Sequence, residues 1–436
     1  RRGHAVRPRL PQPVLHQQRA EPAGRTRQPA DPHQREEDLQ HPRAAAGAGA
    51  GSGIGAGSGK FSSDICVLWT ISRVTSKFLL WEIFCHVIDN HGDLGVSWRL
   101  ALNLAQRGHS VRLWVDDASA LTWMAPYGHP HVRLARWSDI ENTSDFGDVV
   151  IEAFGCKLPA YVESLIAQQG STWINLEYLS AESYVLKSHG LASPVMQGAA
   201  KGHTKWFFYP GFVSGTGGLI RETDLKHRQS IFDRNAWLGR YTQPTSNVSS
   251  YSQSLWISLF CYEPNSLQAF IEQLISAPRP VHLLVTSGRS QRAVAQALEA
   301  LKISESGAGN LQITRLPYLS QEDFDYMLWA CDLNFVRGED SLVRALWSAK
   351  PFIWQIYPQD DQAHHVKLKA FCETMQMPHD LVAIHAVWNG LSDKPLPIIT
   401  SSQIQNWASW AQETALHLSG QQDLVTQLEL FVSQKR

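Results

Sequence analysis

Short apolar runs alternate with amphipathic stretches along most of the chain. Near the start of this pattern we expect a buried strand from Ile83 to Ile88, a helix from Val96 to Arg107 and a second strand from Val111 to Val115, which together form a βαβ unit. The same alternation continues to about residue 212 and resumes over residues 255–375. Repetition of this kind predicts parallel sheets covered by helices on both faces. The expected fold class is therefore α/β, with two such domains facing each other across a cleft.

A polar stretch at residues 241–253 separates the two series and has the composition of a linker. The boundaries that follow are 80–240 for a first domain and 254–400 for a second, with a helical segment at 401–436 that could pack back on the first domain. Residues 1–79 open with a stretch rich in Arg, Pro, Gln and His and continue with Ala-Gly-Ser repeats. Such a segment cannot bury enough apolar surface to offset the entropy of ordering it, so we expect a disordered or non-native N-terminal extension.

Composition narrows the function classes. The 436 residues carry a formal net charge of −1, so no strong field favours nucleic acid or an anionic membrane as a partner. The six cysteines show no C-x-x-C spacing, which favours free thiols and a cytoplasmic location over a disulfide framework or a zinc site. Charged residues interrupt the apolar segment Phe61–Leu80, so it is not predicted to span a membrane. His364 and His365 lack metal-site spacing, and we expect no metal.

The first candidate site is the stretch V-I-D-N-H-G-D-L-G-V, where the predicted first strand stops at Asp89 and Asp93. Ligands of open α/β sheets bind outside the carboxyl ends of the strands, which is where these carboxylates fall. The stretch lacks the G-x-G-x-x-G spacing, and the chain has no G-x-x-x-x-G-K-[ST] motif, so neither nucleotide fingerprint is present. Paired acids suit a cationic or hydroxylic acceptor, or a general base. The alternative is a turn in which Asp89 or Asn90 caps the next helix.

The second candidate site follows the predicted strand Leu333–Val336, as Arg337-Gly338-Glu339-Asp340-Ser341. An arginine offers a planar fork to phosphate oxygens. The glycine permits close backbone approach, and a serine with the amides of a helix N-terminus would complete an anion site. Capping by Asp340 or Ser341 explains part of the cluster, but not Arg337 or Glu339.

Aromatic residues near other strand ends add a possible base-binding face. Phe260 and Tyr262 end the first strand of the second domain, and Tyr318 precedes Gln321 after another strand. Rings can stack on a nucleobase while an amide reads its polar edge. Each of these aromatics taken alone is more often a core residue.

Several motifs in order then show a resemblance to a known family. They are V-I-D-N-H-G-D-L-G-V-S-W-R-L-A, W-F-F-Y-P-G-F, S-L-F-C-Y-E, F-V-R-G-E-D-S-L-V-R-A and P-F-I-W-Q-I-Y-P-Q-D-D-Q-A-H-H-V-K-L-K-A-F. From about Leu80 onward the chain closely resembles the bacterial protein-arginine rhamnosyltransferases, the EarP family. The resemblance implies a GT-B fold with two Rossmann-like domains, the first for the acceptor and the second for the nucleotide sugar. It also implies inverting transfer of rhamnose from dTDP-β-L-rhamnose to an arginine of elongation factor P, in support of translation through consecutive prolines, without metal or other cofactor.

The resemblance assigns roles by position. Catalytic roles are expected for Asp89, Asp93 and Glu339, and the sequence does not settle which aspartate is the general base. Substrate contacts are expected from Asn90, Gly92, Gly95, Phe260, Tyr262, Tyr318, Gln321, Arg337, Gly338, Asp340 and Ser341. The chain departs from the family at His91, where phenylalanine is common.

The reactivity of an arginine acceptor explains why carboxylates would be needed at this site. A guanidinium is protonated and its lone pair is delocalised, so it needs carboxylates to orient it and to take up a proton. Three alternatives stay open at this point. Another GT-B enzyme could use a different nucleotide sugar and acceptor, and a non-catalytic nucleotide-sugar-binding protein would leave the paired aspartates unexplained. A nicotinamide-dependent dehydrogenase shares the fold class but would need the missing glycine fingerprint.

Overall fold

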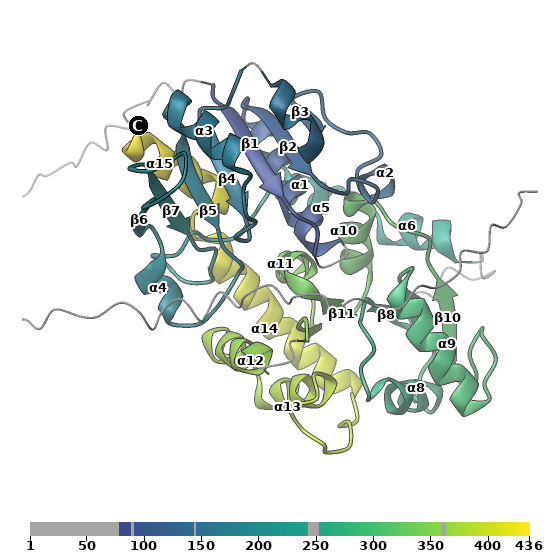
Figure 1. Ribbon diagram of the computed structural model, residues 1–436. Coiled ribbons are helices and arrows are strands. Elements are labelled where there is room, and N and C mark those ends of the chain that lie inside the picture. Colours follow the sequence, from purple (N-terminus) through teal and green to yellow (C-terminus); the bar gives the residue numbers. More distant parts are fainter. Residues whose placement is uncertain (1–77, 89–90, 144, 243–252, 359–362) are drawn as a thin grey trace, which may run out of the picture. The chain divides into compact units, whose positions relative to one another are not determined.

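The computed structural model describes residues 78–436, apart from 89–90, 144, 243–252 and 359–362. Within this part, two separate β-sheets are each covered by helices (Figure 1). Residues before 78 lie outside the described part, and so do Asp89, Asn90 and most of the predicted linker.

The first sheet has seven strands in the order β3-β2-β1-β4-β5-β7-β6. Its neighbours are parallel except for β6 and β7, which pair antiparallel at one edge. The strands are β1 (Leu80–Cys85), β2 (Ser110–Val115), β3 (Val132–Arg136), β4 (Val149–Ala153), β5 (Thr172–Leu176), β6 (Ala192–Pro194) and β7 (Thr204–Phe208). Nearly all side chains of β1, β2, β4 and β5 are buried, which is why these strands are continuous apolar runs in the sequence.

The second sheet has five strands in the order β10-β9-β8-β11-β12, all parallel. The strands are β8 (Leu255–Leu259), β9 (Val281–Val285), β10 (Leu311–Arg315), β11 (Leu333–Arg337) and β12 (Phe352–Gln355). Because the first sheet is mainly parallel and the second is entirely parallel, the predicted α/β class is confirmed.

Helices cover both sheets and connect their strands. Those between β1 and β8 are α1 (Gly92–Gln106), α2 (Leu121–Met124), the 3₁₀ helix η2 (Trp137–Asn142), α3 (Ala160–Gln169), α4 (Tyr184–Ser188), α5 (Leu225–Ser230) and α6 (Arg234–Tyr241). Those after β8 are α8 (Leu267–Ile275), α9 (Arg289–Leu301), α10 (Gln321–Ala330), α11 (Gly338–Ser348), α12 (Ala363–Thr374), α13 (His379–Trp388), α14 (Ser401–Ser419) and α15 (Leu424–Lys435).

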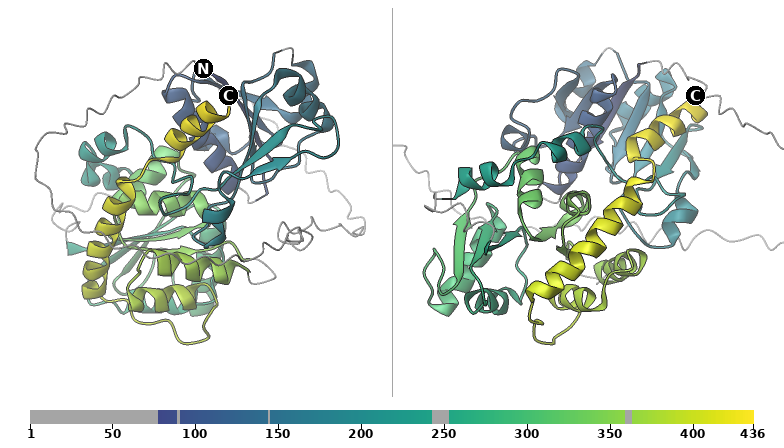
Figure 2. Two further views of the ribbon diagram at one scale, coloured as in Figure 1. Left: turned by 90° about the vertical axis from the view of Figure 1, so that its left-hand side faces the viewer. Right: turned by 180° about the vertical axis from the view of Figure 1, so that it is seen from behind.

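The last two helices contact different cores. Ile404 and Trp407 of α14 are buried in the core of the second sheet. The apolar face of α15 is instead buried in the core of the first sheet, and Arg107 at the end of α1 pairs with Asp423 at 2.6 Å and Glu429 at 2.9 Å. Figure 2 shows these helices in yellow, running from the second sheet to the first.

Two predicted element boundaries were wrong in ways that matter for the site. Strand β1 ends at Cys85 rather than at Ile88, and α1 begins at Gly92 rather than at Val96. The two glycines of the first turn argue against a helix by propensity, yet the backbone N–H of Gly95 donates to the carbonyl of His91 at 2.8 Å. Asp93 therefore lies in the first turn of α1, where a negative charge is favourable, and not in a loop.

The capping expected from Asp340 or Ser341 was also wrong. Helix α11 begins at Gly338, so Glu339 and Asp340 belong to its first turn. Arg337 is its N-cap residue, and neither Asp340 nor Ser341 occupies that position.

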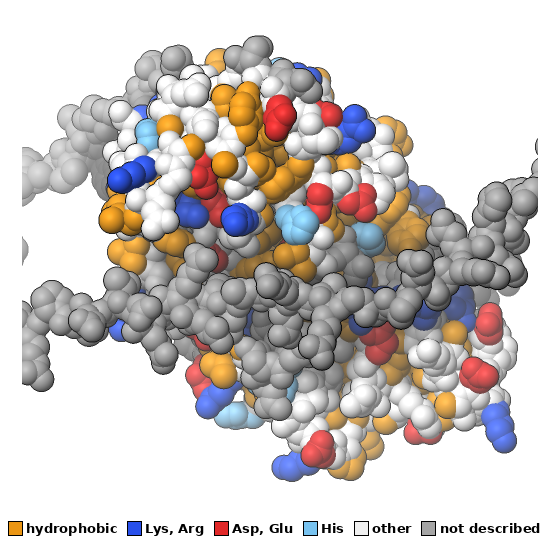
Figure 3. All heavy atoms as spheres, in the orientation of Figure 1, with side chains coloured by type: hydrophobic (Ala, Val, Ile, Leu, Met, Phe, Trp, Pro, Cys, Tyr) orange, Lys and Arg blue, Asp and Glu red, His pale blue; other side chains and the backbone are white. Residues whose placement is uncertain are grey.

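The distribution of surface charge and the hydropathy of the helices bear on which partners the chain could have. On the face drawn in Figure 3, acidic and basic side chains lie interspersed among apolar ones over the described surface. Among the described helices, none is both long enough and apolar enough to cross a membrane.

Candidate active site

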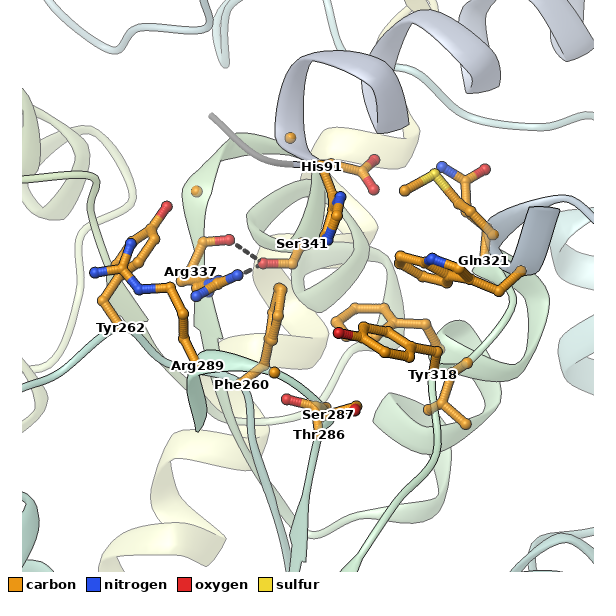
Figure 4. A pocket seen from close by; sticks show the side chains of 18 of the residues that line it. His91, Phe260, Tyr262, Thr286, Ser287, Arg289, Tyr318, Gln321, Arg337 and Ser341 are labelled. Atoms are coloured by element: carbon orange, nitrogen blue, oxygen red, sulfur yellow. Dashed lines mark hydrogen bonds between the residues drawn. The ribbon is translucent and has the colours of Figure 1, made fainter. Parts of the chain in front are cut away.

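A cavity of about 250 Å³ lies where the carboxyl ends of both sheets' strands meet α1 and α2 (Figure 4). The sequence-predicted residues that line it are Gly92, Phe260, Tyr262, Tyr318, Gln321, Arg337, Gly338, Glu339, Asp340 and Ser341. The two candidate motifs, separated by more than two hundred residues in sequence, thus come together at one place.

Arg337 is held rigidly in this cavity. Its guanidinium lies over the rings of Phe260 and Tyr262, with the guanidinium carbon 4.4 Å and 4.5 Å from the ring centroids. One terminal nitrogen donates to the carbonyl of Cys261 at 3.1 Å, and the backbone N–H donates to Ser341 Oγ at 3.0 Å. The Ser341 hydroxyl in turn donates to the Arg337 carbonyl. A fixed planar cation beside a helix N-terminus is suited to a phosphate group.

Asp340 and Gln321 reach across to α1. Asp340 Oδ1 lies 2.9 Å from Arg99 Nε, and Gln321 Nε2 donates to the carbonyl of Gly95 at 3.0 Å. A Cβ atom at Gly95 would lie 3.3 Å from Asp340 Oδ2, so glycine permits this close approach. Burial raises the pKa of the Asp340 carboxyl, and the charge of Arg99 opposes that shift. Both side chains therefore join the two halves of the cavity wall as well as facing the cavity.

Behind Asp340 lies a buried network of charges. Arg99 contacts Glu222 and Asp325, each at 3.3 Å, and Arg344 contacts the same two acids at 2.8 Å and 2.7 Å. Burial alone would raise the pKa of Asp325, but Arg344 and Arg99 lower it to about 2. The acids are thus ionised and paired, and they join α1 to α10 and α11.

Of the two described acids with predicted catalytic roles, Glu339 lines the cavity, whereas Asp93 lies next to the lining residue Gly92 and is not itself a lining residue. Asp93 is buried, and its Oδ2 accepts a hydrogen bond from the backbone N–H of Ile88 at 3.0 Å. Glu339 Oε1 pairs with Lys367 Nζ at 2.9 Å. Burial raises the pKa of Glu339, Lys367 opposes the shift, and the charge of Asp93 adds to it. Asp89 and Asn90 lie outside the described residues, so their predicted roles stay predictions.

Sequence reasoning missed an aromatic contact at the cavity mouth. Trp123 of α2 packs against Tyr318 with ring centroids 4.8 Å apart, and His91 meets the Trp123 ring edge-on at 5.1 Å. Tyr318 is 53% exposed, so its ring is a surface of the cavity and not a core residue. Trp123 is one of sixteen tryptophans in the chain, and no local motif sets it apart.

The loop between β9 and α9 was missed as well. Thr286, Ser287, Gly288 and Arg289 line the cavity, and Arg289 lies over the Tyr262 ring at 4.8 Å. The backbone of Gly288 has φ of +88°, a conformation that favours glycine. A strand followed by T-S-G-R and a helix is the same kind of signal that identified Arg337, and could have identified this loop.

Comparison with known proteins decides the family. A family model for the elongation factor P (EF-P) rhamnosyltransferase EarP matches residues 81–433. The chain belongs to this family. A protein-arginine rhamnosyltransferase of Pseudomonas putida is 44% identical to the chain over 308 residues, covering 67% of the chain and 80% of the relative. Another from Pseudomonas aeruginosa is 36% identical over 384 residues, covering 80% of the chain and 98% of the relative.

A solved structure agrees with this membership of the EarP family. It is described as the structural basis for EarP-mediated arginine glycosylation of translation elongation factor EF-P, and is 29% identical with a TM-score of 0.56. The match covers 82% of this chain and 100% of the other. The predicted family, GT-B fold class and enzyme class are therefore confirmed. The family's enzymes use a nucleotide-sugar donor, and in the described part of this chain no three His, Cys, Asp or Glu side chains are grouped to hold a metal ion.

Proposed function

We propose that this chain transfers rhamnose from dTDP-β-L-rhamnose to an arginine side chain of elongation factor P, at the cavity between its two sheets. The observation that carries the proposal is the meeting of two unlike sites. An arginine between two aromatic rings lies at the start of α11, and the buried carboxylate of Asp93 lies across from it in the first turn of α1. Membership of the EarP family supplies the identity of donor and acceptor.

On the donor side, Arg337 and the N-terminus of α11 would hold the diphosphate. The guanidinium is already oriented by Phe260, Tyr262 and Cys261, so little ordering entropy remains to be lost when the donor binds. The same charge would stabilise the dTDP that leaves. Phe260, Tyr262 and the exposed ring of Tyr318 offer apolar faces to the base and sugars.

On the acceptor side, Asp93 and Asp89 would orient the incoming guanidinium. A guanidinium nitrogen attacks the anomeric carbon as the bond from that carbon to the diphosphate oxygen breaks, which inverts the configuration. The proton released from the nitrogen passes to one of the aspartates. Glu339, which pairs with Lys367, would supply a further negative charge beside the reacting centre.

Two assignments accompany this proposal. Residues 80–240 would carry the acceptor side and residues 254–400 the nucleotide sugar, with 241–253 as the linker. The described cysteines Cys85, Cys156, Cys261, Cys331 and Cys372 are free thiols, which supports action in the cytoplasm, where translation factors work.

The test is the intact mass of elongation factor P after incubation with this chain and dTDP-β-L-rhamnose. We expect a gain of one deoxyhexose with the wild type and none with Asp93→Asn, while dTDP binding to the variant stays within about twofold. The matched control is Asp139→Asn, because Asp139 is 47% exposed and its carboxylate contacts the nearby Arg136 and Ser138. A wild type that binds dTDP-β-L-rhamnose but leaves the factor's mass unchanged would refute the acceptor. Transfer from dTDP-glucose at an equal rate would refute the sugar preference.

A further inference from the structure

Tyr178 and Leu179, which are neighbours in sequence, each contact one of the two described acids to which we assign catalytic roles. The hydroxyl of Tyr178 donates to Asp93 Oδ1 at 3.4 Å, and the backbone N–H of Leu179 donates to Glu339 Oε2 at 2.8 Å. Asp93 belongs to α1 beside the first sheet, and Glu339 belongs to α11 beside the second. A single peptide segment, which begins two residues after β5, therefore contacts an acid from each half of the cavity.

We propose that Tyr178 is a positioning residue, which holds the Asp93 carboxylate in a fixed orientation. Because the next residue, Leu179, binds Glu339 through its backbone N–H, the same segment also fixes the position of Asp93 relative to Glu339. The inference rests on the proposed function, in which these two acids act together on the acceptor arginine. Nothing in the motif resemblance singles out Tyr178, because it lies outside each of the motifs that define it.

The Tyr178 ring is itself held in place by Phe154. The two rings stack with centroids 4.6 Å apart and an interplanar angle of 18°. Phe154 has φ of +58°, a left-handed conformation that is uncommon for a residue other than glycine. Its backbone N–H donates to the carbonyl of Leu176 at 2.7 Å, and the next N–H, of Gly155, donates to Asn175 Oδ1 at 3.1 Å. Backbone strain at such a position persists only where the surroundings fix it, and here it aims an aromatic ring at Tyr178.

A positive charge near the Tyr178 ring completes the arrangement. Lys367 Nζ lies 5.6 Å from the Tyr178 ring centroid while it pairs with Glu339. The ring thus has Phe154 as a stacking partner, a cation near it, and its hydroxyl directed at Asp93. A donor–acceptor distance of 3.4 Å is long, and catalytic hydrogen bonds in unliganded enzymes often tighten when substrate is bound.

Removal of the hydroxyl alone tests the inference, because Tyr178→Phe keeps the stacked ring. We expect kcat for transfer to elongation factor P to fall about ten- to a hundredfold, the range for a lost hydrogen bond to a charged group. The KM for dTDP-β-L-rhamnose should stay within about twofold, since Tyr178 does not line the donor cavity. The matched control is Tyr161→Phe, because Tyr161 on α3 is 38% exposed and its hydroxyl donates to the carbonyl of Glu141, also at 3.4 Å. This control should keep wild-type kcat.

A second measurement, in an Asp93→Glu variant, distinguishes a positioning role of Tyr178 from a purely structural one. If Tyr178 acts through Asp93, the loss caused by Tyr178→Phe should shrink to less than about threefold in an Asp93→Glu enzyme, whose carboxylate is already displaced. A kcat for Tyr178→Phe within twofold of wild type would overturn the inference. So would an equal loss in both backgrounds, or a loss of kcat accompanied by a matching rise in donor KM. If the wild type itself transfers nothing, it is the proposed function that fails, and not the role of Tyr178 alone.

Discussion

The Nε atom of Arg99 lies 2.9 Å from Oδ1 of Asp340, so α1 and α11 are joined by an ion pair at the wall of the cavity. The same guanidinium contacts Glu222 and Asp325, and its side chain is only 5% exposed. A residue that was not predicted as functional thus connects α1, α11 and a buried charge network.

Replacement of Arg99 by alanine should lower the free energy of unfolding by about 3–5 kcal/mol, the usual cost of leaving buried acids without their partner. Urea denaturation at pH 7 would measure this loss. The control is Arg136→Ala, because Arg136 is 78% exposed and its pair with Asp139 should contribute less than about 1 kcal/mol. Equal losses in the two variants would contradict a structural role for the network.

A lysine in place of Arg337 should weaken dTDP binding at least about tenfold, although the charge is retained. The reason is geometric, since the ammonium group cannot fill the plane between Phe260 and Tyr262 or present a fork to the diphosphate. Titration calorimetry with dTDP would measure the change, with the exposed Arg136→Lys as the control. Wild-type affinity in the lysine variant would show that only charge matters at this position.

Truncation of Trp123 should raise the KM for the donor by about five- to tenfold, because Tyr318 loses its packing partner at the cavity mouth. Steady-state kinetics with varied dTDP-β-L-rhamnose would show it. Tyr127→Ala serves as the control, since that aromatic residue follows α2 closely but is 97% exposed. A Trp123→Ala enzyme with unchanged donor KM would show that this tryptophan does not contribute to donor binding.

His91→Phe should keep activity near wild type, because a phenyl ring preserves the edge-on contact with Trp123.

Stability should fall in mild acid because of His385. Burial lowers the pKa of this histidine to about 4, from about 6.5 in the unfolded chain. Between those values the unfolded chain binds the proton and the folded chain does not, so stability is complete above about pH 6.5 and is lost as pH falls toward 4. The contribution is on the order of 3 kcal/mol over that interval.

Urea unfolding at pH 7, 6 and 5 would test the role of His385. Its ring accepts a hydrogen bond from the backbone N–H of Trp354 at 3.0 Å, so His385→Gln should be less stable at pH 7. That variant should also lose less stability on acidification than the wild type does. His417→Gln, at an exposed position of α14, should keep the wild-type slope. An unchanged slope in His385→Gln would show that other groups cause the acid loss.

The sequence predicted the elements of the fold well because parallel strands are buried on both faces and therefore appear as apolar runs. It singled out Arg337, Glu339 and Ser341, which line the cavity, because they lie together in one short motif. The predicted place of Asp93 before the helix was wrong. The low helix propensity of Gly92 and Gly95 argued for a later helix start, but a backbone hydrogen bond from Gly95 to His91 begins the helix at Gly92. Helix propensity is a weak prior that local backbone bonding can override.

Contacts between distant segments were not predictable from one sequence. Trp123 and Tyr318 are almost two hundred residues apart, and nothing local indicates that their rings meet. The same holds for Tyr178, whose hydroxyl reaches Asp93 only because β5 and β1 flank β4 in the sheet order. Contacts of this kind depend on the three-dimensional arrangement of the strands and helices, and no repeating pattern in the sequence indicates them.

The place of α15 has a consequence for biosynthesis. Its side chains Leu424, Val425, Leu428 and Val432 complete the core that begins at Trp81 of β1. That first domain leaves the ribosome long before residue 424, and synthesis of the second domain takes on the order of tens of seconds at about 5–20 residues per second. Until α15 is made, the apolar side chains that it covers are exposed, and exposed apolar surface of this kind favours aggregation. The core of the first sheet is therefore complete only after α15 has been translated, well after the strands of that sheet.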